Sequence, residues 1–145
     1  MATLKISDLS VGDWVRTKDG NVTADIISPL EVVVMKDYGN LCACKIEEIE
    51  PIPITAEILE KNGFIRCSDE FSIYEYTTLL GKILRTTQVR LTTPQSVNVF
   101  LHDTTIERGY YHREKTSVHI LRDEVYVHDL QHALRLAGLD KEINL

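Results

Sequence analysis

The chain has 145 residues, of which 43% are hydrophobic and 26% are charged, and its formal net charge is −6. These values are typical of one soluble globular domain. No apolar run approaches the roughly 20 residues that span a bilayer, and the N-terminal segment lacks the features of a signal peptide. We therefore expect a cytoplasmic protein that does not bind membranes. Because both halves of the chain are acidic, non-specific attraction to nucleic acid is not expected.

The first fifty residues alternate strand-like runs with turns. Turn signals lie at Asp19-Gly20-Asn21 and at Tyr38-Gly39-Asn40. The expected strands are 14–16, 22–27, 31–36 and 41–46. Short strands with tight turns predict a small SH3-like β-barrel over residues 1–50. Trp14 is expected to pack in its interior, and the alternative is a ligand-binding platform in the barrel mouth.

The three cysteines are predicted to be free thiols, because an odd, small number does not suit a disulfide framework. Cys42 and Cys44 form a C-x-C pair, and residues two apart on a strand share one face, so both could bind one metal. Structural zinc usually needs a second ligand pair, which is missing here. The sequence therefore favours packing roles for these cysteines, and no cofactor is expected.

A proline-rich connector separates the first fifty residues from the remainder, 51–145. Pro51 and Pro53 disfavour a helix or a central strand, and Thr55 is placed to cap a helix that Gly63 ends. Because the connector is short, we expect the two parts to pack together.

Residues 64–122 are rich in β-branched and aromatic residues and predict an antiparallel sheet of about four or five strands. One expected strand covers residues 105–112. A final helix is expected over about 124–137, with Gly138 as its stop. The predicted fold class is therefore α+β, with the barrel packed on the sheet, one junction helix and one C-terminal helix.

A set of short motifs is spread over most of the chain but leaves out the central strands, 70–122. The motifs are Leu9 to Val15, Ile49-Glu50-Pro51-Ile52-Pro53-Ile54-Thr55, Ile58-Leu59, Gly63-Phe64, Val127-His128, Leu130-Gln131, Leu134, Gly138 and Glu142. With them the chain resembles a family of small uncharacterised proteins from gut Bacteroidetes and their prophages or mobile elements. The resemblance implies no activity and no catalytic residues.

The C-terminal helix contains H-D-L-Q-H, which is close to the H-E-x-x-H of zinc peptidases. His128 and His132 stand four residues apart and could share a metal, with His119, His112 or His102 as a third ligand. The helical period, however, places Leu130 and Leu134 on the docking face and both histidines on the opposite, solvent-facing side. The sequence therefore favours solvated histidines and no metal site, with a zinc-dependent hydrolase as the alternative.

A run without acidic residues extends from Thr77 to His102 and contains Lys82, Arg85 and Arg90. A basic strand surface of this kind could contact phosphate. Arg85 and Arg90 are five residues apart, so a single patch requires a break in the strand between them.

The sequence favours a non-enzymatic binding or accessory protein of phage or mobile-element origin. Its candidate ligand-binding residues are Trp14 in the barrel mouth and Lys82, Arg85 and Arg90 on the strand surface. The expected partner is another protein or a second copy of the chain, and a nucleic acid is the alternative.

Overall fold

The computed structural model describes residues 4–36, 39–103 and 115–145. It divides into two compact units. The first comprises Met1–Pro53 with Tyr126–His128 and Leu145, and the second comprises Ile54–Val125 with Asp129–Asn144. Each unit contains one antiparallel sheet, which confirms the α+β class. Among the described residues, no helix has the length and apolar character that a membrane span requires.

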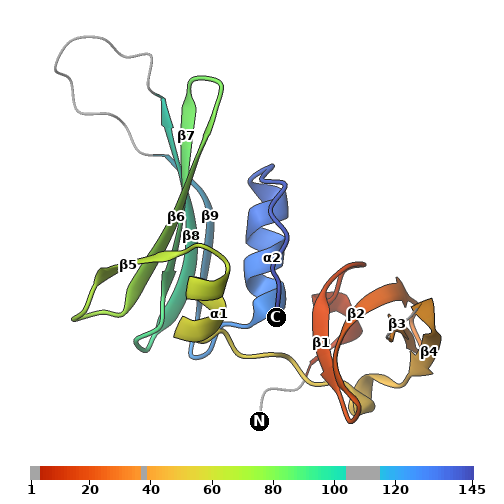
Figure 1. The fold of residues 1–145 in the computed structure, drawn as a ribbon. Helices are drawn as coiled ribbons and strands as arrows, with labels where there is room; N and C mark the ends of the chain where they lie inside the picture. The colour runs from red at the N-terminus through yellow and green to blue at the C-terminus, as the bar shows by residue number, and fades with distance from the viewer. Residues whose placement is uncertain (1–3, 37–38, 104–114) are drawn as a thin grey trace, which may run out of the picture. The chain divides into compact units, whose positions relative to one another are not determined.

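The sheet of the first unit is a four-stranded antiparallel meander (Figure 1). Its strands are β1 (Trp14–Thr17), β2 (Gly20–Ile27), β3 (Val32–Met35) and β4 (Leu41–Cys44). Gly20 follows the turn that joins β1 to β2. Its φ of +125° is a backbone angle that glycine adopts more readily than other residues. Two short 3-10 helices flank the meander, η1 (Ile6–Asp8) before it and η3 (Ile46–Glu48) after it.

The core of the first unit lies on one face of these strands. Burial alternates along β1 and β3, as the two-residue period of a strand requires. Hydrophobic side chains from the strands, from η3 and from the N-terminal segment pack together there. The fully packed members are Leu4, Leu9, Val15, Val22, Ala24, Val32, Val34 and Ile49.

The strand pairing does not confirm the predicted barrel, because the sheet is not closed. The sheet order is β1-β2-β3-β4, and within the described residues β1 and β4 do not pair with each other. After η3 the chain instead returns to the other edge of β1, where Arg16 and Glu50 exchange two backbone hydrogen bonds of 2.9 Å. The far edge of β4 therefore stays open within the described chain, which matters for the candidate site.

The second unit contains a five-stranded antiparallel sheet in which every strand pairs with its neighbour in sequence. Residues 105–112, for which the sequence predicts a strand, lie outside the described residues. The strands are β5 (Ile65–Ser68), β6 (Ile73–Leu80), β7 (Ile83–Arg90), β8 (Gln95–Asp103) and β9 (Lys115–Arg122).

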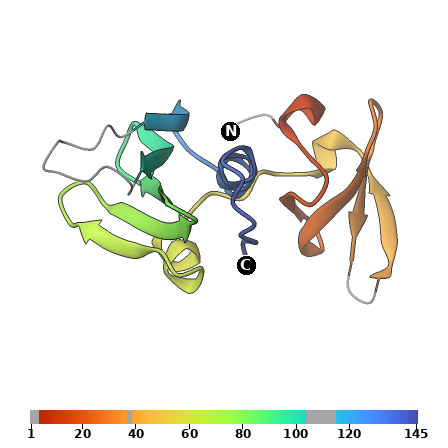
Figure 2. The ribbon, with the colours of Figure 1, turned by 90° about the horizontal axis from the view of Figure 1, so that it is seen from above.

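Helix α1 (Ala56–Lys61) begins where the sequence predicted. Thr55 is its N-cap, and its side-chain oxygen accepts a hydrogen bond from the Ile58 backbone N–H at 3.3 Å. After the helix, Gly63 adopts a φ of +81°. A residue with a side chain adopts this backbone angle only at a cost in free energy. Figures 1 and 2 show α1 beside the sheet of the second unit.

Helix α2 (Val127–Leu136) begins three residues later than the sequence suggested. The reason is a short strand-like pairing just before it. Tyr126 forms a β-bridge with Pro53, and the Val127 N–H donates to the Ile52 carbonyl at 2.8 Å. Because these backbone groups already form hydrogen bonds with the connector, the helix starts only after Tyr126.

Candidate functional site

The two helical histidines do not face solvent as predicted. His128 is only 2% exposed and its ring stacks on Tyr126 with a centroid separation of 5.7 Å, while His132 is half-buried. The prediction failed because it assumed that only the leucine face of α2 is buried. Asp129, also buried, pairs with Arg122 at 3.3 Å, so polar side chains of this helix are accommodated in the interior through specific partners.

The alternative third ligand, His119, has a partner of its own on the sheet. It stands on β9 opposite Asn98 and contacts the Asn98 amide oxygen. This pair points to one face of the sheet, whereas the fully buried Val97 and Val99 point to the other. Within the described part of the chain, no group of three or more His, Cys, Asp or Glu side chains could hold a metal ion. His112 lies outside the described residues.

The arginines of β7 lie on opposite faces of the sheet. The register of β7 with β6 and β8 is continuous from Ile83 to Arg90, so no bulge at Thr86-Thr87 brings Arg85 and Arg90 together. Arg85 donates from Nη1 to the backbone carbonyl of Ala137 at the end of α2, where a cation favours the helix dipole. Arg85 therefore stabilises the end of this helix.

Arg90 stands on the other face of the sheet. Its Nε donates to the Thr92 hydroxyl at 2.9 Å, and its guanidinium carbon lies 5.2 Å from the centre of the Phe71 ring. Lys82 is exposed in the turn between β6 and β7. The structure thus does not combine Lys82, Arg85 and Arg90 into one basic patch.

Trp14 is half-buried and does not belong to the core of the first unit. The next residue, Val15, is completely buried, so the alternation of β1 directs Trp14 to the opposite face. The expectation that Trp14 fills the interior is therefore wrong, and its role as a ligand platform stays a prediction.

We expect Trp14→Ala to cost about 1–2 kcal/mol of unfolding free energy, less than the roughly 3–5 kcal/mol of a tryptophan that is fully buried. Urea denaturation followed by circular dichroism measures this loss. Val15→Ala, on the buried face of the same strand, is the comparison. A cost above 3 kcal/mol for Trp14→Ala would show that the ring is a core residue after all.

A pocket of about 380 Å³ opens in the first unit between the β1–β2 turn and β4. Its residues come from four neighbouring segments that the meander brings to one end of the sheet. They are Thr17, Lys18, Asp19, Lys36, Cys42, Ala43, Cys44 and Glu48. The pocket therefore combines two ammonium groups, two carboxylates, two thiols and one hydroxyl.

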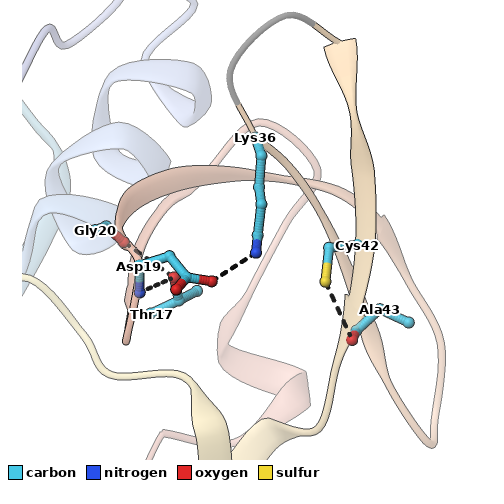
Figure 3. Close-up of polar contacts among 6 residues, drawn as sticks. All are labelled: Thr17, Asp19, Gly20, Lys36, Cys42 and Ala43. Carbon is cyan, nitrogen blue, oxygen red and sulfur yellow. Dashed lines mark hydrogen bonds and ion pairs between the residues drawn. The ribbon is translucent and has the colours of Figure 1, made fainter.

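An ion pair crosses this pocket. Figure 3 shows Lys36 reaching from the end of β3 to Asp19 in the β1–β2 turn, where Nζ lies 2.6 Å from the Asp19 carboxylate. The turn is held by Thr17, whose hydroxyl donates to the Gly20 carbonyl at 3.2 Å and accepts from the Asp19 N–H at 3.2 Å. The hydrogen bond from Lys36 lowers the pKa of Asp19, and the same bond raises the pKa of Lys36.

The two thiols of the pocket share the inward face of β4. Cys42 stands opposite Val34 and Cys44 opposite Val32, both of which are buried. Burial raises the pKa of the Cys44 thiol, and the charge of the neighbouring Cys42 thiol and a hydrogen bond with it raise this pKa further. Lys36 lies within electrostatic reach of both sulfurs, which add to the increase in its own pKa.

The open edge of β4 forms one side of the pocket, and the backbone register shows which of its groups point outward. The Lys36 N–H donates to the Asn40 carbonyl at 2.8 Å, which makes these residues a hydrogen-bonded pair. Such pairs alternate along antiparallel strands, so Cys42 and Cys44 bond to β3. The backbone N–H and C=O groups of Leu41 and Ala43 consequently point to the open edge.

Comparison with protein-family models, with curated proteins and with solved structures finds no match for this chain. The chemistry of the pocket and of the adjoining strand edge is therefore the basis for a functional assignment.

Sequence reasoning missed this pocket, although its elements were noticed separately. The Asp19-Gly20-Asn21 turn and the Cys42/Cys44 pair were both recognised as local patterns. Lys36, which links them, gave no signal, because a lone lysine after a strand is ordinary. The pairing of β3 with both β2 and β4 was needed to bring Lys36 between the turn and the thiols.

Proposed function

We propose that this protein is a non-enzymatic binding module that holds an extended peptide segment of a protein partner along the open edge of β4. The observation that carries the proposal is an unpaired strand edge beside a pocket of charged and soft side chains. In β-strand addition, main-chain hydrogen bonds supply affinity and adjoining pockets select side chains.

The sequence of β4 supports this proposal. Its residues, Leu41 to Cys44, contain no charged side chain and no proline, which are the usual means of preventing strand pairing at an edge. Leu41 is 54% exposed and stands opposite the exposed Met35, so an apolar side chain of the peptide has a surface to cover. The outward N–H and C=O groups of Leu41 and Ala43 provide two pairs of hydrogen-bonding groups.

The pocket also favours a peptide over a nucleic acid. Lys18 and Lys36 are balanced by Asp19 and Glu48, so the pocket has no net positive charge to attract phosphate. The two arginines proposed as phosphate ligands stand on opposite faces of a different sheet. A partner that offers both backbone groups and a polar side chain fits the pocket better.

The SH3-like architecture belongs to this proposal as well. The order of four strands, a 3-10 helix and a final pairing of Glu50 with β1 supports a relationship with SH3-like barrels. The proposed origin in a phage or mobile element rests on the sequence motifs alone. The alternative of a zinc hydrolase at His128 and His132 has less support, because His128 is buried and stacked on Tyr126.

Selection from an unbiased library of displayed short peptides, followed by calorimetric titration of the selected peptides, tests the proposal. Ala43→Pro is expected to weaken binding at least about tenfold, because it removes an outward N–H and places a ring at the edge. The exposed side chain of Ala43 makes Ala43→Val the matched control, which keeps the N–H and should bind normally.

Two outcomes would contradict peptide addition at β4. One is selection of no peptide by the folded protein, and the other is equal affinity of the Ala43→Pro and wild-type proteins. Circular dichroism shows whether Ala43→Pro retains its sheet. A parallel titration with labelled DNA and RNA separates the alternative, since binding of nucleic acid without any peptide would favour a nucleic-acid module.

A further inference from the structure

Two thiols in the pocket have no role in strand addition, which uses the backbone of Leu41 and Ala43. Cys42 and Cys44 alternate with these residues, so their side chains point to the opposite side of the β4 surface from the Leu41 and Ala43 side chains. Both are half-buried, and both line the pocket. They are therefore protected from bulk solvent but accessible to a small species that enters the pocket.

The two sulfurs are neighbours. Residues two apart on a strand have Cα atoms about 6.6 Å apart and parallel side chains, so the two thiols lie side by side on one face of β4. Cys42 also donates a hydrogen bond to the Ala43 carbonyl at 3.7 Å. A metal ion that enters the pocket therefore meets both thiols from the same side.

The number of ligands restricts the choice of metal. Among the described residues no third His, Cys, Asp or Glu completes a site around these sulfurs. Zinc prefers four ligands in a tetrahedral arrangement, and calcium or magnesium prefers oxygen. Soft thiolates select soft ions, among which copper(I) is satisfied by two sulfur ligands in line.

The binding step balances without a redox reaction. When copper(I) binds, each thiol loses one proton and two Cu–S bonds form, so the product is a bis-thiolate complex with one negative charge. Lys36 lines the same pocket, and its ion pair with Asp19 at 2.6 Å holds the ammonium there. The anionic complex therefore forms beside a positive group whose charge Asp19 partly offsets.

We propose that Cys42 and Cys44 form a two-coordinate site for copper(I) in the pocket of the first unit, beside the Lys36 ammonium. The site is independent of the proposed peptide function, because it uses the thiols and not the outward backbone groups of β4.

Titration of the reduced protein without oxygen tests the site, with copper(I) supplied as a complex with a coloured chelator that competes for the ion. We expect one copper(I) per chain. Cys42→Ser and Cys44→Ser should each abolish its binding, because a single thiolate cannot hold the ion against the chelator. Cys67→Ser is the matched control, since Cys67 is an exposed cysteine of the second unit without a neighbouring cysteine.

Two further variants keep the test decisive. Lys36→Met should weaken copper(I) binding about 2–5-fold, as expected for the loss of a partly exposed charge pair, while Lys36→Arg should restore it. Ala43→Val, which keeps the strand and both thiols, should bind copper(I) normally, and binding of copper(I) by a protein that selects no peptide separates the two proposals. The proposal is overturned if wild-type protein takes no copper(I) from the chelator, if either Cys42→Ser or Cys44→Ser still binds it, or if Cys67→Ser loses it.

Discussion

Leu134→Ala is expected to destabilise the protein by about 2–5 kcal/mol. Leu134 lies in α2 and is 0% exposed. Removal of three carbon atoms from a closely packed site loses the transfer free energy of the side chain and leaves a cavity that the surroundings fill only in part. Urea denaturation followed by circular dichroism gives the change in unfolding free energy.

Leu136→Ala is the control for this prediction. Leu136 is a leucine of the same helix, two residues from Leu134, but its side chain is 76% exposed. We expect a change within about 0.5 kcal/mol, since exposed leucine contributes little and alanine favours helix. Equal losses for the two variants would mean that α2 does not pack through Leu134.

Asp13→Ala is the second substitution with a large expected effect, about 2–3 kcal/mol. Asp13 is 0% exposed, and its carboxylate accepts a hydrogen bond from the Ser10 N–H at 2.7 Å. Its backbone carbonyl also accepts from the Ala24 N–H at 2.9 Å, so the residue fixes the turn that leads into β1. Without the carboxylate, the Ser10 N–H loses a charge-assisted hydrogen bond to a buried acceptor.

The chain provides a matched control for Asp13 in the preceding turn. Asp8 accepts a hydrogen bond from the Lys5 N–H at 3.1 Å, with the same spacing of three residues, but it is only half-buried. Asp8→Ala should therefore cost about 1 kcal/mol or less, because water can replace the carboxylate. Fluorescence of Trp14, the single tryptophan of the chain, follows unfolding of the first unit in both variants. A smaller loss for Asp13→Ala than for Asp8→Ala would contradict the role given to burial.

Local patterns were sufficient wherever a structure depends on neighbours in sequence. Thr55 and Gly63 predicted the ends of α1, because a cap and a left-handed stop act on the adjacent backbone. The β-branched runs of residues 64–122 predicted antiparallel strands for the same reason. The sequence by itself thus determined the α+β class and the existence of most of the elements.

Only the tertiary structure decided what each face of an element contacts. Helical periodicity placed His128 on the solvent side, yet it is buried against Tyr126, and Asp129 is buried with Arg122 as its partner. The large apolar ring of Trp14 predicts a core position, but in β1 it is Val15 that lies in the core. A period shows that two faces differ; which face is buried depends on partners that are distant in sequence.

The candidate site also depends on tertiary structure. Asp19, Lys36 and the Cys42/Cys44 pair come from three separate segments, and none of them shows in the sequence that the others are near. Antiparallel pairing of β2, β3 and β4 brings them to one end of the sheet and leaves the edge of β4 open. The sequence determined which chemical groups the protein possesses, and strand register, a long-range property, decided which of them meet.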